Sequence, residues 1–168
     1  SAFKTRLVQN NNDEKSIVLQ GLQSDDLEKK LALLSLGLDK FKEVNDALGH
    51  AVGDILLFEA AKRILDCVKK QGTVARFNGD EFGVILSELD ELQSVDRIAQ
   101  NIIQSLSLPF FLGGENIFIS VSIGISTYPE NAKKQEDLLK NAQQAMQEAK
   151  LLGRNRFNYF TQSMQVLH

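Results

Sequence analysis

Residues 76–82 read RFNGDEF and lie between two apolar runs whose length and composition are typical of β-strands. An Asn-Gly pair accepts the positive φ angles of a tight turn, so the pattern predicts a β-hairpin with this pair at its tip. The next two residues, Asp80 and Glu81, repel one another and are suitable ligands for a divalent cation. Taken alone, the heptad is also compatible with a solvated acidic turn.

Length and composition indicate one globular domain. The chain has 168 residues, of which 43% are hydrophobic and 24% charged, enough to bury a substantial core. Its net charge of -3 argues against nucleic acid as a partner, because such binding favours a basic face. No apolar run approaches the roughly 20 residues of a membrane span, and the polar start does not resemble a signal peptide. We therefore expect a cytoplasmic domain, either free or as the cytoplasmic part of a membrane-anchored protein.

The single cysteine, Cys67, cannot form an internal disulfide, which favours a reducing compartment. It follows Leu56, Ala60 and Ile64 at helical spacing, so these four residues form one apolar stripe. The pattern predicts that Cys67 belongs to the core and is not a nucleophile.

Hydrophobic periodicity predicts an α+β fold. Residues 31–38 are apolar except for Ser35 and Gly37, as in a strand that is buried on both faces. The other predicted strands are 73–77, 82–86, 117–126 and 156–160, with a hairpin through 110–114, and the predicted helices are 39–49, 52–70, 91–106 and 134–152. This order predicts a mostly antiparallel central sheet flanked by helices.

The predicted domain occupies residues 30–160. Residues 1–29 form an incomplete helical or irregular lead-in, with a weak helical face at Phe3, Leu7 and Val8, and residues 161–168 form a polar tail.

A second polar cluster follows the first predicted strand. Backbone N–H groups at a helix N-terminus favour anions, and Lys42 lies in the first turn of the predicted helix, where acidic residues are usual. The cluster predicts a site for phosphate and metal, although Lys42 could also be an ordinary surface lysine.

Four motifs in this order resemble the GGDEF domain of diguanylate cyclases. They read DKFKxxNDxxGHxxGD at 39–54, RFxGDEF at 76–82, SIGIS at 122–126 and AKxxGRN at 149–155. The resemblance covers residues 30–160 and implies a fold like that of polymerase palms and nucleotidyl cyclases. It also implies an activity that joins two GTP molecules into cyclic di-GMP, with one GTP on each of two facing domains.

The resemblance assigns catalytic roles to the acidic turn. Asp80 matches a metal-binding acid that helps to activate the attacking 3′-hydroxyl, and Glu81 matches the acid beside it. Gly79 matches a position at which the backbone approaches the phosphates.

Five further residues match substrate-binding positions. Asn45 and Asp54 match the guanine-reading residues, and a carboxylate can accept hydrogen bonds from the guanine ring N–H and amine. Lys42, Lys150 and Arg154 match the cations that bind phosphate. Lys150 and Arg154 also suit the C-terminus of a helix, where they complement its dipole.

The resemblance implies Mg²⁺ or Mn²⁺ together with bound nucleotide, but one expected ligand is missing. Active members carry an acid two residues before Asp39, and this chain has Gly37 there. The backbone carbonyl of Leu38 remains available as a ligand. Asp39 lies on the same strand face as Gly37 but about 6–7 Å further along, so it could replace the acid only after local rearrangement.

Other departures concern the turn and its surroundings. Asn78 replaces the first glycine of the signature and still tolerates left-handed angles. The inhibitory Arg-x-x-Asp product site corresponds to KKQG at 69–72, so feedback there is not expected. The end of the chain resembles the junction that precedes an EAL phosphodiesterase domain in tandem GGDEF–EAL proteins.

Three hypotheses follow. The first is a catalytically impaired GGDEF domain that serves cyclic di-GMP signalling as a GTP-binding or regulatory and dimerising module. The second is an active diguanylate cyclase, working as a homodimer. The third is a structural interaction domain without nucleotide. The expected partners are GTP, a second GGDEF domain and an adjacent EAL or sensory domain.

Overall fold

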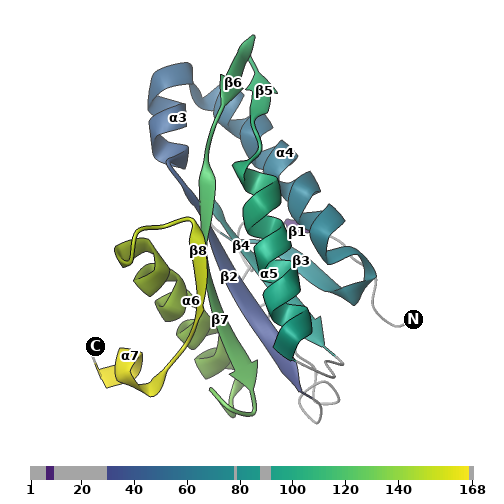
Figure 1. The fold of residues 1–168 in the computed structure, drawn as a ribbon. Helices are drawn as coiled ribbons and strands as arrows, with labels where there is room; N and C mark the ends of the chain where they lie inside the picture. The colour runs from purple at the N-terminus through teal and green to yellow at the C-terminus, as the bar shows by residue number, and fades with distance from the viewer. Residues whose placement is uncertain (1–6, 10–29, 78, 88–91, 167–168) are drawn as a thin grey trace.

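The computed structural model describes residues 7–9, 30–77, 79–87 and 92–166. Its centre is a six-stranded sheet with the strand order β1-β3-β4-β2-β7-β8 (Figure 1). The strands are β1 (Leu7–Gln9), β2 (Leu31–Asp39), β3 (Gly72–Arg76), β4 (Glu81–Ser87), β7 (Ser120–Tyr128) and β8 (Arg156–Tyr159). The inner pairs are antiparallel and the two edge pairs are parallel, so the predicted α+β fold with a mostly antiparallel sheet is confirmed.

Helices lie on both faces of this sheet. The helices are α3 (Phe41–Leu48), α4 (His50–Val68), α5 (Leu92–Ser107), α6 (Gln135–Leu151) and the short α7 (Gln162–Val166), with a 3-10 turn, η1 (Lys69–Gln71), after α4. A separate hairpin of β5 (Phe110–Leu112) and β6 (Glu115–Ile117) lies beside α3 and α4 at one end of the molecule (Figure 1).

Strand β2 is buried along its whole length, as the sequence predicts. Successive side chains of a strand point to opposite faces. Leu34 and Leu36 therefore belong to the core that the sheet forms with α4 and α5. Leu31 and Leu33 instead pack in a second cluster that includes residues of α6. Burial on both faces explains why β2 is mostly apolar, with Ser35 and Asp39 as its polar residues.

Three local expectations are corrected. Leu7 and Val8 belong to the edge strand β1, which pairs with β3, and not to a helical face, while Phe3 lies outside the described residues. The strand predicted over 117–126 is divided, because β6 pairs only with β5 and β7 begins at Ser120. Part of the predicted tail forms α7, at Gln162–Val166.

Helix α6 lies directly against the backbone of β7, and Gly124 permits this approach. A methyl group on Gly124 would overlap with the backbone nitrogen of Met146 and the carbonyl oxygen of Ala142. The backbones of α6 and β7 cannot move aside locally, so this contact fixes the height of α6 above the sheet.

We expect Gly124→Ala to lower the free energy of unfolding by about 3 kcal/mol, because the added methyl group meets rigid backbone atoms. Urea denaturation measures the change. Gly37→Ala on the neighbouring strand is the matched control, since the three atoms nearest to its methyl group belong to two flexible side chains, Lys150 and Met146. We expect this control to cost less than about 1 kcal/mol, and equal losses for the two variants would contradict the account of α6.

Candidate functional site

The acidic turn is the hairpin that the sequence predicts. Strands β3 and β4 pair antiparallel on either side of it, and Gly79 has a φ of +59°. The Phe77 N–H donates to the Glu81 carbonyl at 2.7 Å, and Arg76 Nε donates to the Gly79 carbonyl at 3.1 Å. Asn78 lies outside the described residues. The turn is therefore held by its own backbone and by one arginine.

The turn lies against the end of β2. The Leu38 N–H donates to the Asp80 carbonyl at 3.1 Å, and Gly37 pairs in register with Glu81. Gly37 also pairs with Ser122 on β7. Cross-strand partners share a face of the sheet. The side chain of Glu81 therefore starts on the face where a side chain at residue 37 would lie, and Gly37 has none. The structure thus brings the two halves of the expected metal site together.

The space beside Gly37 is occupied by Lys150, which extends from the last turn of α6. A methyl group on Gly37 would lie 2.9 Å from Lys150 Cε and 3.1 Å from Lys150 Nζ. Met146 Sδ would be 3.0 Å away. A lysine ammonium therefore lies where the family pattern places a carboxylate.

Asp39 makes a different set of contacts. Its side chain is 1% exposed and accepts hydrogen bonds from Ser120 Oγ at 2.6 Å and Ser122 Oγ at 2.8 Å. The Asn155 N–H also donates to it at 3.3 Å, and Arg154 Nε lies 3.8 Å away. Both oxygens of Asp39 are thus used to hold the loop that follows α6.

These residues do not form a site suited to Mg²⁺ or Mn²⁺. Gly37 supplies no side-chain oxygen, and the Lys150 ammonium beside it repels a cation. Asp39, the alternative ligand, is bound by two hydroxyl groups, a backbone N–H and Arg154. In the part of the chain that the structure describes, no three His, Cys, Asp or Glu side chains are grouped to hold a metal ion.

The predicted guanine-reading residues lie where α3 meets α4. The Asn45 side-chain oxygen packs against Gly53, so closely that a methyl group on Gly53 would overlap with it. That oxygen is buried and makes no hydrogen bond with any residue that the structure describes. Asp54, which follows Gly53 in the chain, is exposed near the start of α4, and Lys42 is exposed on α3. Asn45 and Asp54 therefore come from adjoining helices at one corner of the fold.

The Gly49 backbone makes this corner possible. Gly49 has a φ of +93°, and its N–H donates to the Asn45 carbonyl at 2.9 Å. The Gly53 N–H then donates to the Gly49 carbonyl at 3.1 Å. The chain thus ends α3 and starts α4 within a single residue.

Comparison with known proteins concerns the family and the fold. The family model described as "Diguanylate cyclase, GGDEF domain" matches residues 6–156. Among curated proteins, the chain is 42% identical over 137 residues to the bifunctional diguanylate cyclase/cyclic di-GMP phosphodiesterase MucR of Pseudomonas aeruginosa. It is 44% identical over 123 residues to the diguanylate cyclase TpbB of the same species. These matches cover 82% and 73% of the chain.

The chain belongs to the GGDEF domain family. A solved structure of the TpbB GGDEF domain superposes with a TM-score of 0.86 at 35% identity, covering 95% of this chain and 94% of that one. An EAL/GGDEF domain protein from M. capsulatus gives a TM-score of 0.81 at 40% identity, covering 89% of this chain and 95% of that one. The chain spans only 20% of the length of MucR and 28% of the length of TpbB. No helix in the described part of this GGDEF domain has the length and apolarity needed to cross a membrane.

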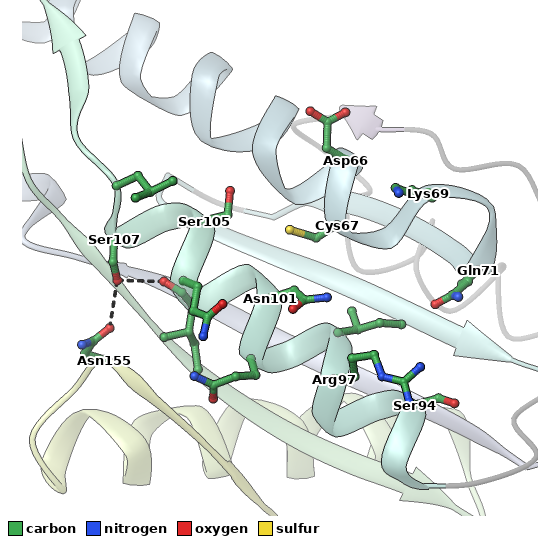
Figure 2. Close-up of a pocket in the computed structure, with 15 residues that line it drawn as sticks. Asp66, Cys67, Lys69, Gln71, Ser94, Arg97, Asn101, Ser105, Ser107 and Asn155 are labelled. Atoms are coloured by element: carbon green, nitrogen blue, oxygen red, sulfur yellow. Dashed lines mark hydrogen bonds between the residues drawn. The ribbon is translucent and has the colours of Figure 1, made fainter.

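A large cavity in this GGDEF domain lies away from the acidic turn. It has a volume of about 1100 Å³ and lies between the end of α4 and one side of α5 (Figure 2). Lys69 and Gln71, from the stretch that replaces the inhibitory product motif, line it together with Arg97. None of the predicted catalytic, guanine-reading or phosphate-binding residues lines it. No sequence pattern predicts this cavity, because its walls come from α4 with η1, α5 and the loop after α6, which are far apart in the chain.

The partners of Asp39 were also missed at the sequence level. Ser122 lies within the quoted SIGIS motif, and Ser120 is two residues earlier on the same strand face. Their alternation with apolar residues was the available signal, since hydroxyl groups on a buried strand face need a polar partner.

We expect Asp39→Ala to lower the free energy of unfolding by about 3 kcal/mol, because the buried Ser122 hydroxyl, the half-buried Ser120 hydroxyl and one N–H lose their acceptor. Urea denaturation measures this change. Asp46→Ala is the control, as Asp46 is exposed on α3, and should cost less than about 0.5 kcal/mol. Similar losses for the two variants would show that the Asp39 contacts contribute little.

Cys67 lies half-buried at the wall of the cavity and packs against the core (Figure 2). Burial raises the pKa of its thiol, so less thiolate is present at a given pH. At pH 8 we expect alkylation by iodoacetamide to be about tenfold slower than for the same chain unfolded in urea, and to accelerate as the pH rises. Equal rates in the two states would contradict the interpretation of Cys67 as a core residue.

Proposed function

We propose that this GGDEF domain binds GTP and serves cyclic di-GMP signalling as a regulatory or dimerising module, with little or no cyclase activity. The observation that carries the proposal is that the end of the Lys150 side chain lies against Gly37. The strand position expected to hold a metal-binding carboxylate instead lies under an ammonium group. The residues that match nucleotide-binding positions are all present.

Recognition of guanine is supported by the corner between α3 and α4. A buried polar atom normally has a hydrogen-bond partner, and the Asn45 side-chain oxygen has none among the described residues. Asp54 adds an exposed carboxylate next to Gly53, the residue against which Asn45 packs. An amide oxygen and a carboxylate accept from N–H groups, and guanine offers its ring N–H and amine. Adenine does not present the same pattern.

Weak turnover is supported by the end of β2. In phosphoryl transfer between two nucleotides, carboxylate-bound metal ions stabilise the attacking and leaving oxygens. Loss of a principal carboxylate removes several kcal/mol of that stabilisation, on the order of a thousandfold in rate. Asp80 and Glu81 remain at the turn, but Gly37 supplies nothing opposite them.

The names of the relatives are consistent with either a catalytic or a regulatory GGDEF domain. MucR is named as bifunctional, TpbB as a diguanylate cyclase and NbdA of Pseudomonas aeruginosa, 36% identical over 160 residues, as a cyclic di-GMP phosphodiesterase. The chain spans 20% of NbdA. An adjacent EAL or sensory domain, and pairing with a second GGDEF domain, are part of the proposal.

Calorimetric titration with GTP tests nucleotide binding. We expect micromolar affinity for GTP and at least about tenfold weaker binding of ATP, because ATP lacks the guanine donors. Asp54→Ala should weaken GTP binding about tenfold, while the control Asp46→Ala on α3 should leave it unchanged. Absence of heat with GTP would favour a purely structural interaction domain.

Incubation with GTP and Mg²⁺ or Mn²⁺, followed by chromatography, tests turnover. The proposal expects cyclic di-GMP to be absent or formed about a thousandfold more slowly than by the TpbB domain assayed alongside. Robust product that Asp80→Ala abolishes would establish an active cyclase and refute the impaired state.

A further inference from the structure

The contact between Lys150 and Gly37 changes the charge of the site as well as removing a ligand. We propose that this domain binds the triphosphate of GTP without a divalent cation, and that the Lys150 ammonium supplies the positive charge beside β2. The ligand class is therefore a metal-free purine nucleoside triphosphate. This inference rests on the proposed function, because it concerns the phosphates of the same nucleotide.

The first step concerns ligands for a metal. Mg²⁺ requires near-octahedral coordination by oxygen atoms. Beside β2, Gly37 has no side-chain oxygen, and both oxygens of Asp39 already accept hydrogen bonds. The carboxylates of Asp80 and Glu81 come from one turn only, on a single side of the site. The backbone carbonyl of Leu38 is neutral. Beside β2, the described residues therefore lack the facing carboxylate that would draw a metal from the nucleotide complex.

The second step concerns charge. Lys150 Nζ would lie 3.1 Å from a methyl group on Gly37, so the ammonium lies above the strand backbone itself. A divalent cation at this position would be repelled by Lys150, whereas a phosphate oxygen would be attracted. A triphosphate without metal carries more negative charge than its magnesium complex, and charge-assisted hydrogen bonds to it are correspondingly strong.

The third step concerns preorganisation. Lys150 lies in the last turn of α6, whose height above the sheet is fixed by Gly124. Arg154 follows in a loop that is held by Asp39, and its own N–H donates to the Ala149 carbonyl at 3.0 Å. Two cations from one helix end are thus positioned by the folded chain without a bound ion. Glu81 on β4 is in register with Gly37 on β2, so its side chain starts on the same face of the sheet as residue 37.

Calorimetry of the purified domain with GTP, once in EDTA and once in excess Mg²⁺, tests the inference. We expect the dissociation constant in EDTA to be no larger than the one in excess Mg²⁺, because Lys150 attracts the metal-free triphosphate at least as strongly as the magnesium complex. Binding that is detectable only with Mg²⁺ would overturn the inference and leave the proposed function standing. Absence of binding in both buffers would overturn both.

Lys150→Met tests the assigned cation. In EDTA it should raise the dissociation constant for GTP about tenfold, because a charged hydrogen bond to phosphate is lost. Lys140→Met is the matched control: Lys140 is exposed on the same helix, about 15 Å along its axis from Lys150. Equal affinities of Lys150→Met and the unchanged domain would overturn the assignment.

Gly37→Asp tests whether the missing carboxylate at residue 37 is the reason that GTP binds without Mg²⁺. The new carboxylate should pair with Lys150, so GTP binding in EDTA should weaken about tenfold and Mg²⁺ should restore it. Gly37→Ala adds bulk without charge and should still bind GTP without Mg²⁺. The inference would be overturned if Mg²⁺ did not change the affinity of the Gly37→Asp variant for GTP, or if the Gly37→Ala variant required Mg²⁺ to bind GTP. Thermal unfolding of each variant confirms that the comparison is made on folded protein.

Discussion

Burial of β2 on both faces is the constraint on which the rest of this structure depends. A strand covered by helices above and below offers no solvent to any of its side chains, so each one must be apolar or must be paired. Leu34 and Leu36 meet this condition toward α4 and α5, and Leu31 and Leu33 meet it toward α6. Asp39 at the end of the strand meets it through two serines and a backbone N–H. The polar end of an otherwise apolar strand thereby becomes a fixed point around which the loop after α6 is arranged.

Helix α6 connects this constraint to the site. Its backbone lies on β7 because Gly124 has no side chain, and its last turn then places Lys150 over Gly37. Two glycines on neighbouring strands therefore have different consequences. One allows the helix to approach, and the other leaves room for the tip of a lysine where the family pattern has an acid. The same packing that stabilises the sheet thus decides the charge beside the acidic turn.

Local chemistry explains which features could be predicted from the sequence. The Asn-Gly turn, the apolar β2 and the apolar stripe of α4 depend on residues close together in the chain, and all three elements form as expected. The division of the strand after Ile117 was not predictable, since it depends on β6 pairing with β5 alone. Ser120 and Ser122 contact Asp39 across more than 80 residues of sequence. A local pattern shows that such serines need partners but does not name them.

The sequence by itself determined the family, the fold class and the absence of a carboxylate at residue 37, because motifs, periodicity and residue identity are properties of the chain. Only the tertiary structure decided what takes the place of that carboxylate. Lys150 and Gly37 are brought together by the packing of α6 on the sheet, and Asp39 is withdrawn from the site by donors on β7 and in the loop after α6. The physical reason is that close packing and the pairing of buried polar groups act between elements far apart in the sequence.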